Sequence, residues 1–446
     1  AGGCTYEAAE VVCHTGEGLE VLDGVTSLVE KSLLRQEGVE EPRFTMLETI
    51  REYAREKLAE RGGVETVRAA HAAWFLHLAE EAEPELAGPD QGEWMVLLER
   101  ELDNLRDVLS WFLDRGEQEW ELRLASVLHS FWYDRGFWSE GQHWLEEGLA
   151  RDTGVPPAVR ARALYSLGSI AAAQADYKRA LPLLHTALAL YQELPDQGGI
   201  ALVLGDLGLA ACRRGQYGRA ATFLEESLQI LQAVGDRRGS SFTLDKLGYL
   251  AIEQGDLATA KERHTEALTI YKALGDSTRI ALALTNLGDV AGREGNLVEA
   301  EALFDQSLGL LRKIGATAHI TMVLLNLGEV AGRRGHHGQA RAWLNESLSL
   351  AWELGDFHVT LGVLGVMAKL AVDGGRAMRA VRLEATRMAL QERLGIPLPA
   401  YYQTGQEEVQ AEAKVLLGDE DFNAAWEKGR HTSLKEAVAY ALDESN

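Results

Sequence analysis

Polar and charged side chains recur at a fixed place beside a repeated Leu-Gly pair. That place is the residue before Leu and the residues one and five after Gly. The side chains found there are Lys246, Tyr249, Glu253, Asn286, Asp289, Arg293, Asn326, Glu329 and Arg333, with Arg213 one unit earlier. Amides, carboxylates and guanidinium groups at helical spacing suit noncovalent binding through hydrogen bonds and ion pairs. Whether these ten residues share one surface depends on the elements that carry them.

A simpler interpretation exists for two of these sets. Asp289 with Arg293, and Glu329 with Arg333, are each four residues apart. On the wet face of a helix such pairs contribute only about 0.3–0.5 kcal/mol each and need no ligand to explain them. Both interpretations, a ligand site and surface ion pairs, stay open at this point.

Residue patterns that would indicate catalysis or metal binding are missing from the sequence. It contains no G-x-S-x-G, no H-E-x-x-H, no paired cysteines and no G-x-x-x-x-G-K-[ST] phosphate loop. His336-His337 has no Cys or carboxylate at ligand spacing, so it is interpreted as a solvated turn. Tryptophans could stack a ligand but at helical spacing are more often core, and they are Trp111, Trp120, Trp132, Trp138 and Trp144. We expect no catalytic residue, no metal site and no enzyme activity in this chain.

A 40-residue repeat organises the middle of the chain. Leu-Gly occurs at 167–168, 207–208, 247–248, 287–288 and 327–328. A turn glycine follows at 215, 255, 295, 335 and 375, and alanine recurs at 180, 220, 260, 300, 340 and 380. Such landmarks predict pairs of helices around a glycine turn that stack to share one core, with the small residues where helices cross. The fold class is therefore all-α.

These repeats resemble the tetratricopeptide repeat family. The resemblance is carried by Leu287-Gly288, Gly295, Ala300, Phe304 and Ser307-Leu308. The period of 40 residues exceeds the usual 34 and is similar to the long-helix variety in bacterial regulatory ATPases. The resemblance implies a superhelix with a concave groove lined by each first helix, where the ten polar residues would face a bound peptide. It also implies that Asn286 and Asn326 hydrogen-bond the peptide backbone.

The N-terminal third predicts a small domain of helices with one β-hairpin. Helices are expected over 5–15, 19–32 and 48–61, with the hairpin formed by 32–36 and 43–47. This order resembles a winged helix that begins at its second helix. Segments 22–24, 27–33, 46–54, 71–75 and 102–106 resemble the winged-helix and linker region of bacterial STAND proteins, which are signal-transduction ATPases with numerous domains.

Four segments follow from these observations. We expect a partial winged-helix domain over 1–62, a helical linker over 63–119, a superhelix over 120–395 and capping helices over 396–446. The first repeat, 120–155, is degenerate and the regular repeats span 156–395. The capping helices are expected over 407–417, 421–428 and 433–442.

The charge of the chain limits its partners. The net charge is -24, and residues 1–150 hold 32 acidic against 13 basic residues. An acidic surface repels phosphate backbones and anionic lipids, so nucleic acid and membrane partners are disfavoured. Cys4, Cys13 and Cys212 make no disulfide framework, and the sequence has no signal core, so we expect the cytoplasm.

The resemblance implies a sensor region. The repeats would bind a peptide, protein or small-molecule signal and couple it to a nucleotide switch. ATP or ADP is expected only on a missing upstream nucleotide-binding domain, because the chain begins without Met and has no phosphate loop. Two alternatives stay open: a free-standing scaffold for protein assembly, and a DNA-binding regulator acting through the winged helix. The oligomeric state and the identity of the ligand are not predicted.

Overall fold

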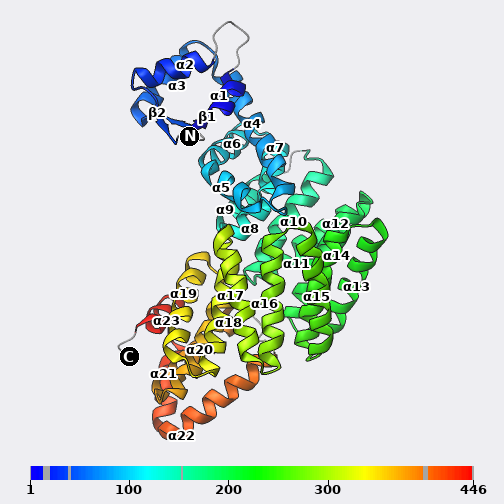
Figure 1. Cartoon of the computed structure of the whole chain (residues 1–446), viewed down its shortest axis with the longest axis vertical. Coiled ribbons are helices and arrows are strands. Elements are labelled where there is room, and N and C mark those ends of the chain that lie inside the picture. Colours follow the sequence, from blue (N-terminus) through cyan, green and yellow to red (C-terminus); the bar gives the residue numbers. More distant parts are fainter. Residues whose placement is uncertain (1, 14–20, 39–41, 152–153, 395–399, 444–446) are drawn as a thin grey trace.

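The computed structural model describes residues 2–13, 21–38, 42–151, 154–394 and 400–443, with side chains of the last segment described from residue 407. A small N-terminal domain projects from a body of stacked helix pairs (Figure 1). The predicted superhelix of helix pairs preceded by a small domain with one β-hairpin is confirmed. No helix in these described ranges combines the length and apolar character needed to cross a bilayer.

In its described residues, the N-terminal domain contains three helices and a three-stranded antiparallel sheet. Its elements are β1 (Cys4–Thr5), α1 (Tyr6–Cys13), α2 (Val21–Glu30), β2 (Arg35–Glu37), β3 (Arg43–Thr45) and α3 (Glu48–Glu60). The strand order is β1-β3-β2, so the predicted β2–β3 hairpin is present. Part of the helix expected over 19–32 lies outside the described residues.

The expected helix over 5–15 was wrong at its start. Cys4 and Thr5 form β1 and pair with Phe44 and Arg43 of β3, which gives β3 a second neighbour. The Thr5 hydroxyl accepts a hydrogen bond from the backbone N–H of Ala8 at 3.2 Å. Thr5 thus acts as a cap, a role that favours extended backbone just before a helix.

A helical linker and a degenerate repeat follow. They comprise α4 (Val64–Glu85), α5 (Gln91–Arg100), α6 (Leu102–Arg115), α7 (Gln118–Val127), α8 (His129–Arg135) and α9 (Trp138–Ala150). Phe131 and Trp132 are fully buried and Trp138 nearly so, within one core shared by α4–α10. Trp120 is exposed. The core interpretation of the tryptophans therefore holds for Trp111, Trp132 and Trp138, in part for the half-buried Trp144, and not for Trp120.

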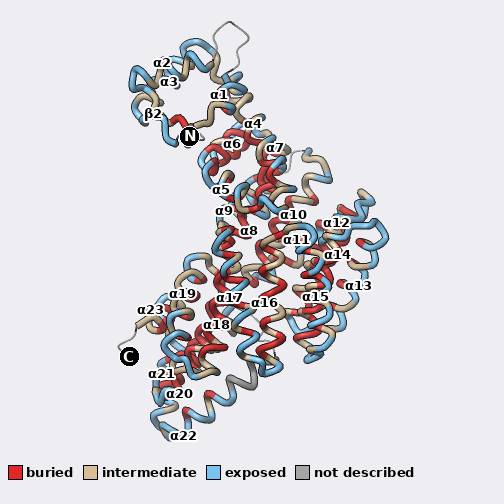
Figure 2. The backbone as a smooth tube through the Cα atoms, in the orientation of Figure 1, coloured by how far each residue is buried: buried red, intermediate tan, exposed pale blue. Residues whose placement is uncertain are grey.

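Six regular helix pairs form the body of the molecule. Their first helices are α10 (Pro157–Ala173), α12 (Gln197–Arg213), α14 (Arg237–Glu253), α16 (Ser277–Arg293), α18 (Thr317–Arg333) and α20 (Phe357–Asp373). Their second helices are α11 (Tyr177–Glu193), α13 (Tyr217–Val234), α15 (Leu257–Leu274), α17 (Leu297–Ile314), α19 (His337–Leu354) and α21 (Ala377–Leu394). Buried residues concentrate along the first helices (Figure 2).

The repeated small residues lie at the helix crossings, as predicted. A Cβ added to Gly288 would lie 2.6 Å from the ring of Phe304, and one added to Gly208 would lie 2.6 Å from Leu224. Ala300 is fully buried at the same crossing. A larger side chain would hold the two helices apart, which explains why these landmarks keep their register.

The Gly-Asp dipeptides end one helix and begin the next. Gly235 adopts a left-handed φ of 75° after α13, a conformation that glycine adopts without steric cost. Asp236 then accepts a hydrogen bond from the backbone N–H of Gly239 at 2.8 Å. This N-cap satisfies a free donor in the first turn of α14.

Two helices, α22 (Ala400–Arg430) and α23 (Leu434–Leu442), close the chain. The separate helices expected over 407–417 and 421–428 fall within α22, which breaks at Gly418, where φ is 73°. Ser433 and Glu436 form a capping box at the start of α23. Both helices pack on α21, covering its apolar face.

The superhelix returns to the linker that precedes it. The Oε1 atom of Gln91 accepts a hydrogen bond from the backbone N–H of Thr278 at 3.0 Å. Arg135 donates to the carbonyl of Gly315 at 2.7 Å, and His319 Nε2 lies 3.0 Å from Asp134 Oδ1. We call this contact of α5 and α8 with α16–α18 the seam. The seam closes one side of the space inside the superhelix. Stacked repeats without this contact would leave that side open.

Candidate functional site: a polar cavity inside the superhelix

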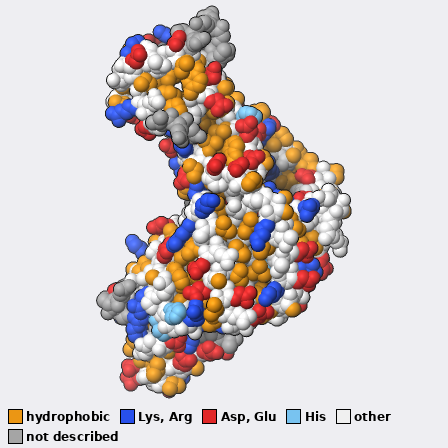
Figure 3. Space-filling model, in the orientation of Figure 1, with side chains coloured by type: hydrophobic (Ala, Val, Ile, Leu, Met, Phe, Trp, Pro, Cys, Tyr) orange, Lys and Arg blue, Asp and Glu red, His pale blue; other side chains and the backbone are white. Residues whose placement is uncertain are grey.

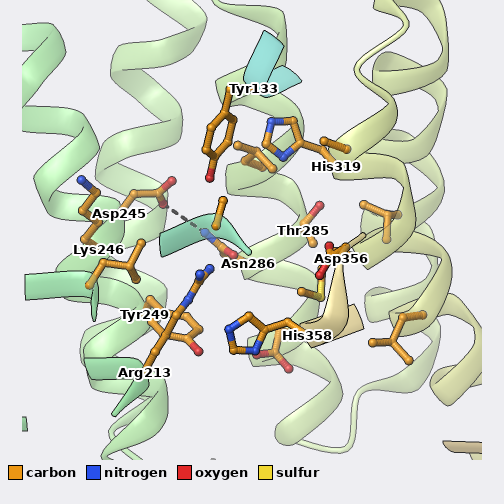
Figure 4. A pocket seen from close by; sticks show the side chains of 18 of the residues that line it. Tyr133, Arg213, Asp245, Lys246, Tyr249, Thr285, Asn286, His319, Asp356 and His358 are labelled. Atoms are coloured by element: carbon orange, nitrogen blue, oxygen red, sulfur yellow. Dashed lines mark hydrogen bonds between the residues drawn. The ribbon is translucent and has the colours of Figure 1, made fainter. Parts of the chain in front are cut away.

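A cavity of about 1260 Å³ lies inside the superhelix. Its walls come mainly from the six first helices, with further residues from α7 and α8 on one side and from α21 and α22. Figure 4 shows side chains of several first helices converging on this space, with Tyr133 entering from α8. The predicted open groove is therefore a more enclosed chamber, because the seam adds a wall.

All ten residues predicted from the sequence line this cavity. Nine of them are half-buried and Arg333 is exposed. The repeat places them on one face because they occupy the same three positions of their first helices: the residue before Leu and those one and five after Gly. Their role in binding stays a prediction.

The two interpretations of the i,i+4 pairs are not exclusive. Arg293 Nε lies 3.1 Å from Asp289 Oδ1, so this ion pair forms, and it forms inside the cavity. Arg293 also lies 3.8 Å from Glu253 of the preceding repeat. Arg333 donates instead to the carbonyl of Gly292 at 3.0 Å. Ion pairing across repeats thus orders this part of the wall.

Asn286 is held at the end of a buried polar network. Its Nδ2 atom lies 3.4 Å from Asp245 Oδ1, a long and weak hydrogen bond. Asp245 in turn lies 2.6 Å from Nδ1 of His264, which is fully buried where other repeats place a core residue. The network joins α14, α15 and α16 and leaves capacity on the Asn286 amide for a ligand.

Important lining residues were missed by the sequence prediction. Tyr133 and Asp134 come from the degenerate repeat, and Arg279, His319 and His358 come from the first turns of α16, α18 and α20. The signal that could have found the last three is their place just after the repeat boundary. No periodic signal marks Tyr133. Its place in the cavity wall depends on how α8 meets α18, which is set by the pitch of the superhelix.

Burial sets the charge of the histidines in the cavity. Burial lowers the pKa of His129 to about 4. Burial, with the charge of Arg213, lowers the pKa of His358 to about 3. Both imidazoles are therefore neutral near pH 7 and offer hydrogen bonds rather than charge.

The cavity presents charges of both signs. Lys246 lies 2.7 Å from Asp206, and the Asp206 pKa is lowered because the favourable charge and hydrogen bond of Lys246 outweigh burial. Near the seam, the guanidinium of Arg279 lies 4.4 Å from the centre of the Phe242 ring. Acidic and basic side chains are also interspersed over the outer face in Figure 3. Such a lining suits a ligand that carries hydrogen-bond donors and acceptors as well as positive and negative charges.

The described part of the chain holds no cluster of three His, Cys, Asp or Glu residues placed to bind a metal ion. His336 and His337 lie exposed at the start of α19, away from the cavity. Cys212 is buried and free.

Two family profiles match the chain. The profile described as "Tetratricopeptide repeat" matches residues 159–233, 199–273 and 279–351. The profile described as "Winged helix-turn-helix domain" matches residues 1–59. The two matched parts are the two parts predicted from the repeat and from the N-terminal pattern.

Curated relatives match a shorter stretch. A Mycobacterium tuberculosis protein that carries the name of an HTH-type transcriptional regulator is 36% identical over 171 residues. The match covers 36% of this chain and 19% of that protein. A Mycobacterium bovis protein with the same kind of name matches equally. The matched stretch thus spans about a fifth of the length of these relatives.

Solved structures share the fold at low sequence identity. The STAND protein with a tetratricopeptide repeat sensor from Pyrococcus horikoshii is 14% identical, with a TM-score of 0.54 over 99% of this chain and 62% of that one. NprR in complex with its cognate peptide NprX is 15% identical, with a TM-score of 0.52 over 79% of this chain and 97% of that one. At such identities the likeness shows the fold alone.

Proposed function

We propose that this chain, a winged helix-turn-helix domain followed by tetratricopeptide repeats, is the sensor region of a signal-transduction regulator. In this proposal a short peptide binds in the cavity of the superhelix. The binding changes the relation between the repeats and the linker, and that change reaches a nucleotide switch on a part of the protein outside this chain. The chain itself would not hydrolyse ATP.

One observation carries the proposal. The cavity draws its walls from the regular repeats, from α8 of the degenerate repeat and from Gln91 of the linker, so one bound molecule could touch all three. Its volume of about 1260 Å³ exceeds the roughly 300–1,000 Å³ of most small-molecule pockets. A peptide of several residues fits this volume better than a drug-sized molecule, and it would use the mixed charges and the Asn286 amide.

The comparisons support this proposal without deciding it. The NprR title names a cognate peptide, and the Pyrococcus horikoshii title names a tetratricopeptide repeat sensor in a STAND protein. The curated relatives carry the names of transcriptional regulators. Their activities belong to whole proteins of which this chain matches a part.

A chain of polar contacts offers a route from the cavity to the N-terminal domain. Arg135, at the end of α8, contacts Gly315 of the repeats and lies 2.9 Å from Glu99 of α5. Two residues on, buried Glu101 pairs with Arg43 of β3. A ligand that moves α8 against α18 would therefore act on the segment that holds the winged-helix domain. Coupling along this route is part of the proposal.

The experiment is capture of peptides by the purified chain. A synthetic hexapeptide library of mixed sequence is passed over the immobilised chain, and the retained peptides are identified by mass spectrometry. Retained peptides are then titrated by calorimetry against the wild type and against Tyr133→Ala. The exposed pair Arg312 and Glu346 on the outer helices supplies the control variant, Arg312→Ala.

We expect micromolar or tighter binding that Tyr133→Ala weakens at least tenfold and Arg312→Ala leaves unchanged. Failure to retain any hexapeptide would overturn the peptide-sensor proposal. Retention that survives Tyr133→Ala but not Arg312→Ala would place the interface on the outer surface and favour the scaffold alternative. Salt-dependent binding of the chain to duplex DNA would instead favour a role for the winged helix as a reader of DNA.

A further inference from the structure

Most cations of the cavity are already neutralised by a carboxylate. Lys246 pairs with Asp206, Arg293 with Asp289, and Arg387 of α21 with Glu384 at 2.6 Å. Lys369 pairs with Asp373 at 2.8 Å. Three lining cations form no such ion pair among the described residues: Arg213, Arg279 and Arg333. Arg333 donates to the carbonyl of Gly292, and Arg279 lies over the Phe242 ring with the charges of Asp276 and Asp134 acting on it. Arg213 differs from these two in the groups that surround it.

The neighbours of Arg213 are mostly neutral groups. Its guanidinium is half-buried, the phenols of Tyr177, Tyr249 and Tyr133 surround it, and the Tyr177 hydroxyl forms a hydrogen bond with it. Figure 4 shows Arg213 beside Tyr249, with His358 across from it. The Tyr177 hydroxyl and His358 Nε2 lie 3.2 Å apart and so form a hydrogen bond with each other. His358 is neutral near pH 7, so it adds no second positive charge beside Arg213.

The two carboxylates in the vicinity are committed to other partners. Glu253, one repeat further on, lies 3.8 Å from Arg293. Asp356 caps α20 by accepting a hydrogen bond from the backbone N–H of Val359 at 3.0 Å. Arg213 influences both carboxylates through space but is bonded to neither. The Tyr177 hydroxyl interacts with one of its guanidinium donors, and neither of these carboxylates takes the others.

Position at the end of a helix explains only part of this arrangement. Arg213 is the last residue of α12, where the helix dipole favours a cation by about 0.3–1 kcal/mol. Arg214, the next residue, is exposed and would serve the dipole equally well. A bound anion would stabilise a half-buried guanidinium more than the helix dipole does. The reason is that charge-assisted hydrogen bonds strengthen where water is restricted.

We propose that Arg213 is the residue of the cavity that binds an anionic group of the ligand, a carboxylate or a phosphate, with the hydroxyls of Tyr133 and Tyr249 completing the site. The planar guanidinium matches either oxyanion through two parallel hydrogen bonds. Burial raises the pKa of both tyrosines, so their hydroxyls keep their protons and can donate. The proposal deepens the peptide-sensor function, since a peptide carries a terminal carboxylate or acidic side chains.

The first test uses simple anions and does not depend on any peptide. The melting temperature of the full chain is followed against inorganic phosphate and, separately, acetate, at constant ionic strength set with chloride. The variants are Arg213→Met, Arg213→Lys and Arg214→Met. Arg214→Met removes the same charge from the adjacent exposed residue, so it controls for net charge. Nonspecific anion binding is disfavoured by the net charge of -24.

We expect phosphate or acetate to raise the melting temperature of the wild type and of Arg214→Met. Arg213→Met should lose that rise, and Arg213→Lys should retain a part of it, because lysine keeps the charge but not the bidentate geometry. An equal rise in Arg213→Met, or no rise in the wild type, would overturn the anion site. Stabilisation by phosphate alone would assign the site to a phosphate group, and stabilisation by acetate would assign it to a carboxylate.

A second arm separates this proposal from the proposed function. The hexapeptide library is offered with free C-terminal carboxylates and, in parallel, with amidated C-termini. Peptides of both forms retained equally by the wild type and by Arg213→Met would support the peptide sensor and contradict the anion site. Retention of neither form, combined with Arg213-dependent stabilisation by phosphate, would support the anion site and contradict the peptide sensor.

Discussion

Nε2 of His319 lies 3.0 Å from Oδ1 of Asp134, although 185 residues separate the two in sequence. Asp134 belongs to α8 and is buried, and His319 belongs to the first turn of α18. Their contact joins the two ends of the arc formed by the first repeats and closes the cavity on that side. A ligand bound beside Asp134 and His319 would either leave this contact intact or break it.

This contact is expected to contribute measurably to stability. Asp134→Ala and His319→Ala should each lower the free energy of unfolding by about 1–3 kcal/mol, since each leaves a buried polar partner unsatisfied. The double variant should cost less than the sum of the two, with a coupling energy of about 1 kcal/mol or more. Urea denaturation of the four proteins gives that cycle.

The exposed Arg312–Glu346 pair, at 2.6 Å on the outer helices, provides the matched cycle. Its coupling energy should be within about 0–1 kcal/mol, as for other surface pairs. Equal coupling energies in the two cycles would mean that the seam is not a specific contact.

The close helix crossing at Gly288 predicts strong intolerance of larger residues. Gly288→Val should destabilise the chain by about 1–3 kcal/mol because its branched side chain would meet the Phe304 ring. Gly309, on the exposed face of α17, has open space around it. Gly309→Ala should therefore stabilise the chain by about 0.5–1 kcal/mol through helix propensity. Thermal and urea denaturation distinguish these signs, and a stable Gly288→Val would refute the crossing.

Glu121 makes stability depend on pH. This residue is fully buried, and its carboxylate oxygens have no hydrogen-bond partner among the described residues. Burial raises its pKa from 4.5 to about 8, despite the nearby charge of Arg151. Its contribution to stability is therefore complete below about pH 4.5 and is lost progressively as pH rises through about 8.

Glu121→Gln removes that titration while keeping the shape of the side chain. We expect it to stabilise the chain by about 1–3 kcal/mol at pH 8 and to have little effect at pH 5. Melting curves from pH 5 to pH 8 for the variant and the wild type supply the measurement. Parallel curves over this range would show that Glu121 has an ordinary pKa.

The Asn residues beside Leu-Gly carry the most specific binding prediction from the sequence. Asn286→Ala with Asn326→Ala should weaken binding of a retained hexapeptide by about 1–3 kcal/mol, the value of two amide hydrogen bonds. The melting temperature should hardly change, because the Asn286 amide makes only long contacts, 3.4 Å to Asp245 and 3.5 Å to His264. Gln232→Ala, an amide lost from the exposed face of α13, is the control. Unaltered affinity in the double variant would remove both residues from the site.

Much of the fold could be predicted because it is local and repeated. Gly288 and Ala300 recur in register, and packing at a crossing depends on residues only 16 positions apart, such as Gly288 and Phe304. The same periodicity identified the ten lining residues, since the same three positions of each first helix face inward. Sequence patterns report such local relations well.

The enclosure of the cavity could not be predicted in this way. The pairing of Asp134 with His319 depends on the accumulated rotation from repeat to repeat, which no single repeat encodes. Tyr133 therefore looked like part of a degenerate repeat rather than a wall of the site. At the other end of the chain, the helix expected over 5–15 wrongly included Thr5, because the strand that pairs with Thr5, β3, lies some 40 residues away.

Hydrogen exchange of the full chain with and without a retained hexapeptide tests the central claim most directly. Binding inside the cavity should slow exchange in 129–135 of α8 and in 317–333 of α18 together, while the outer helices α13, α15 and α17 stay unchanged. Protection confined to the outer helices, or absent from α8, would contradict a ligand site enclosed by the repeats and the linker.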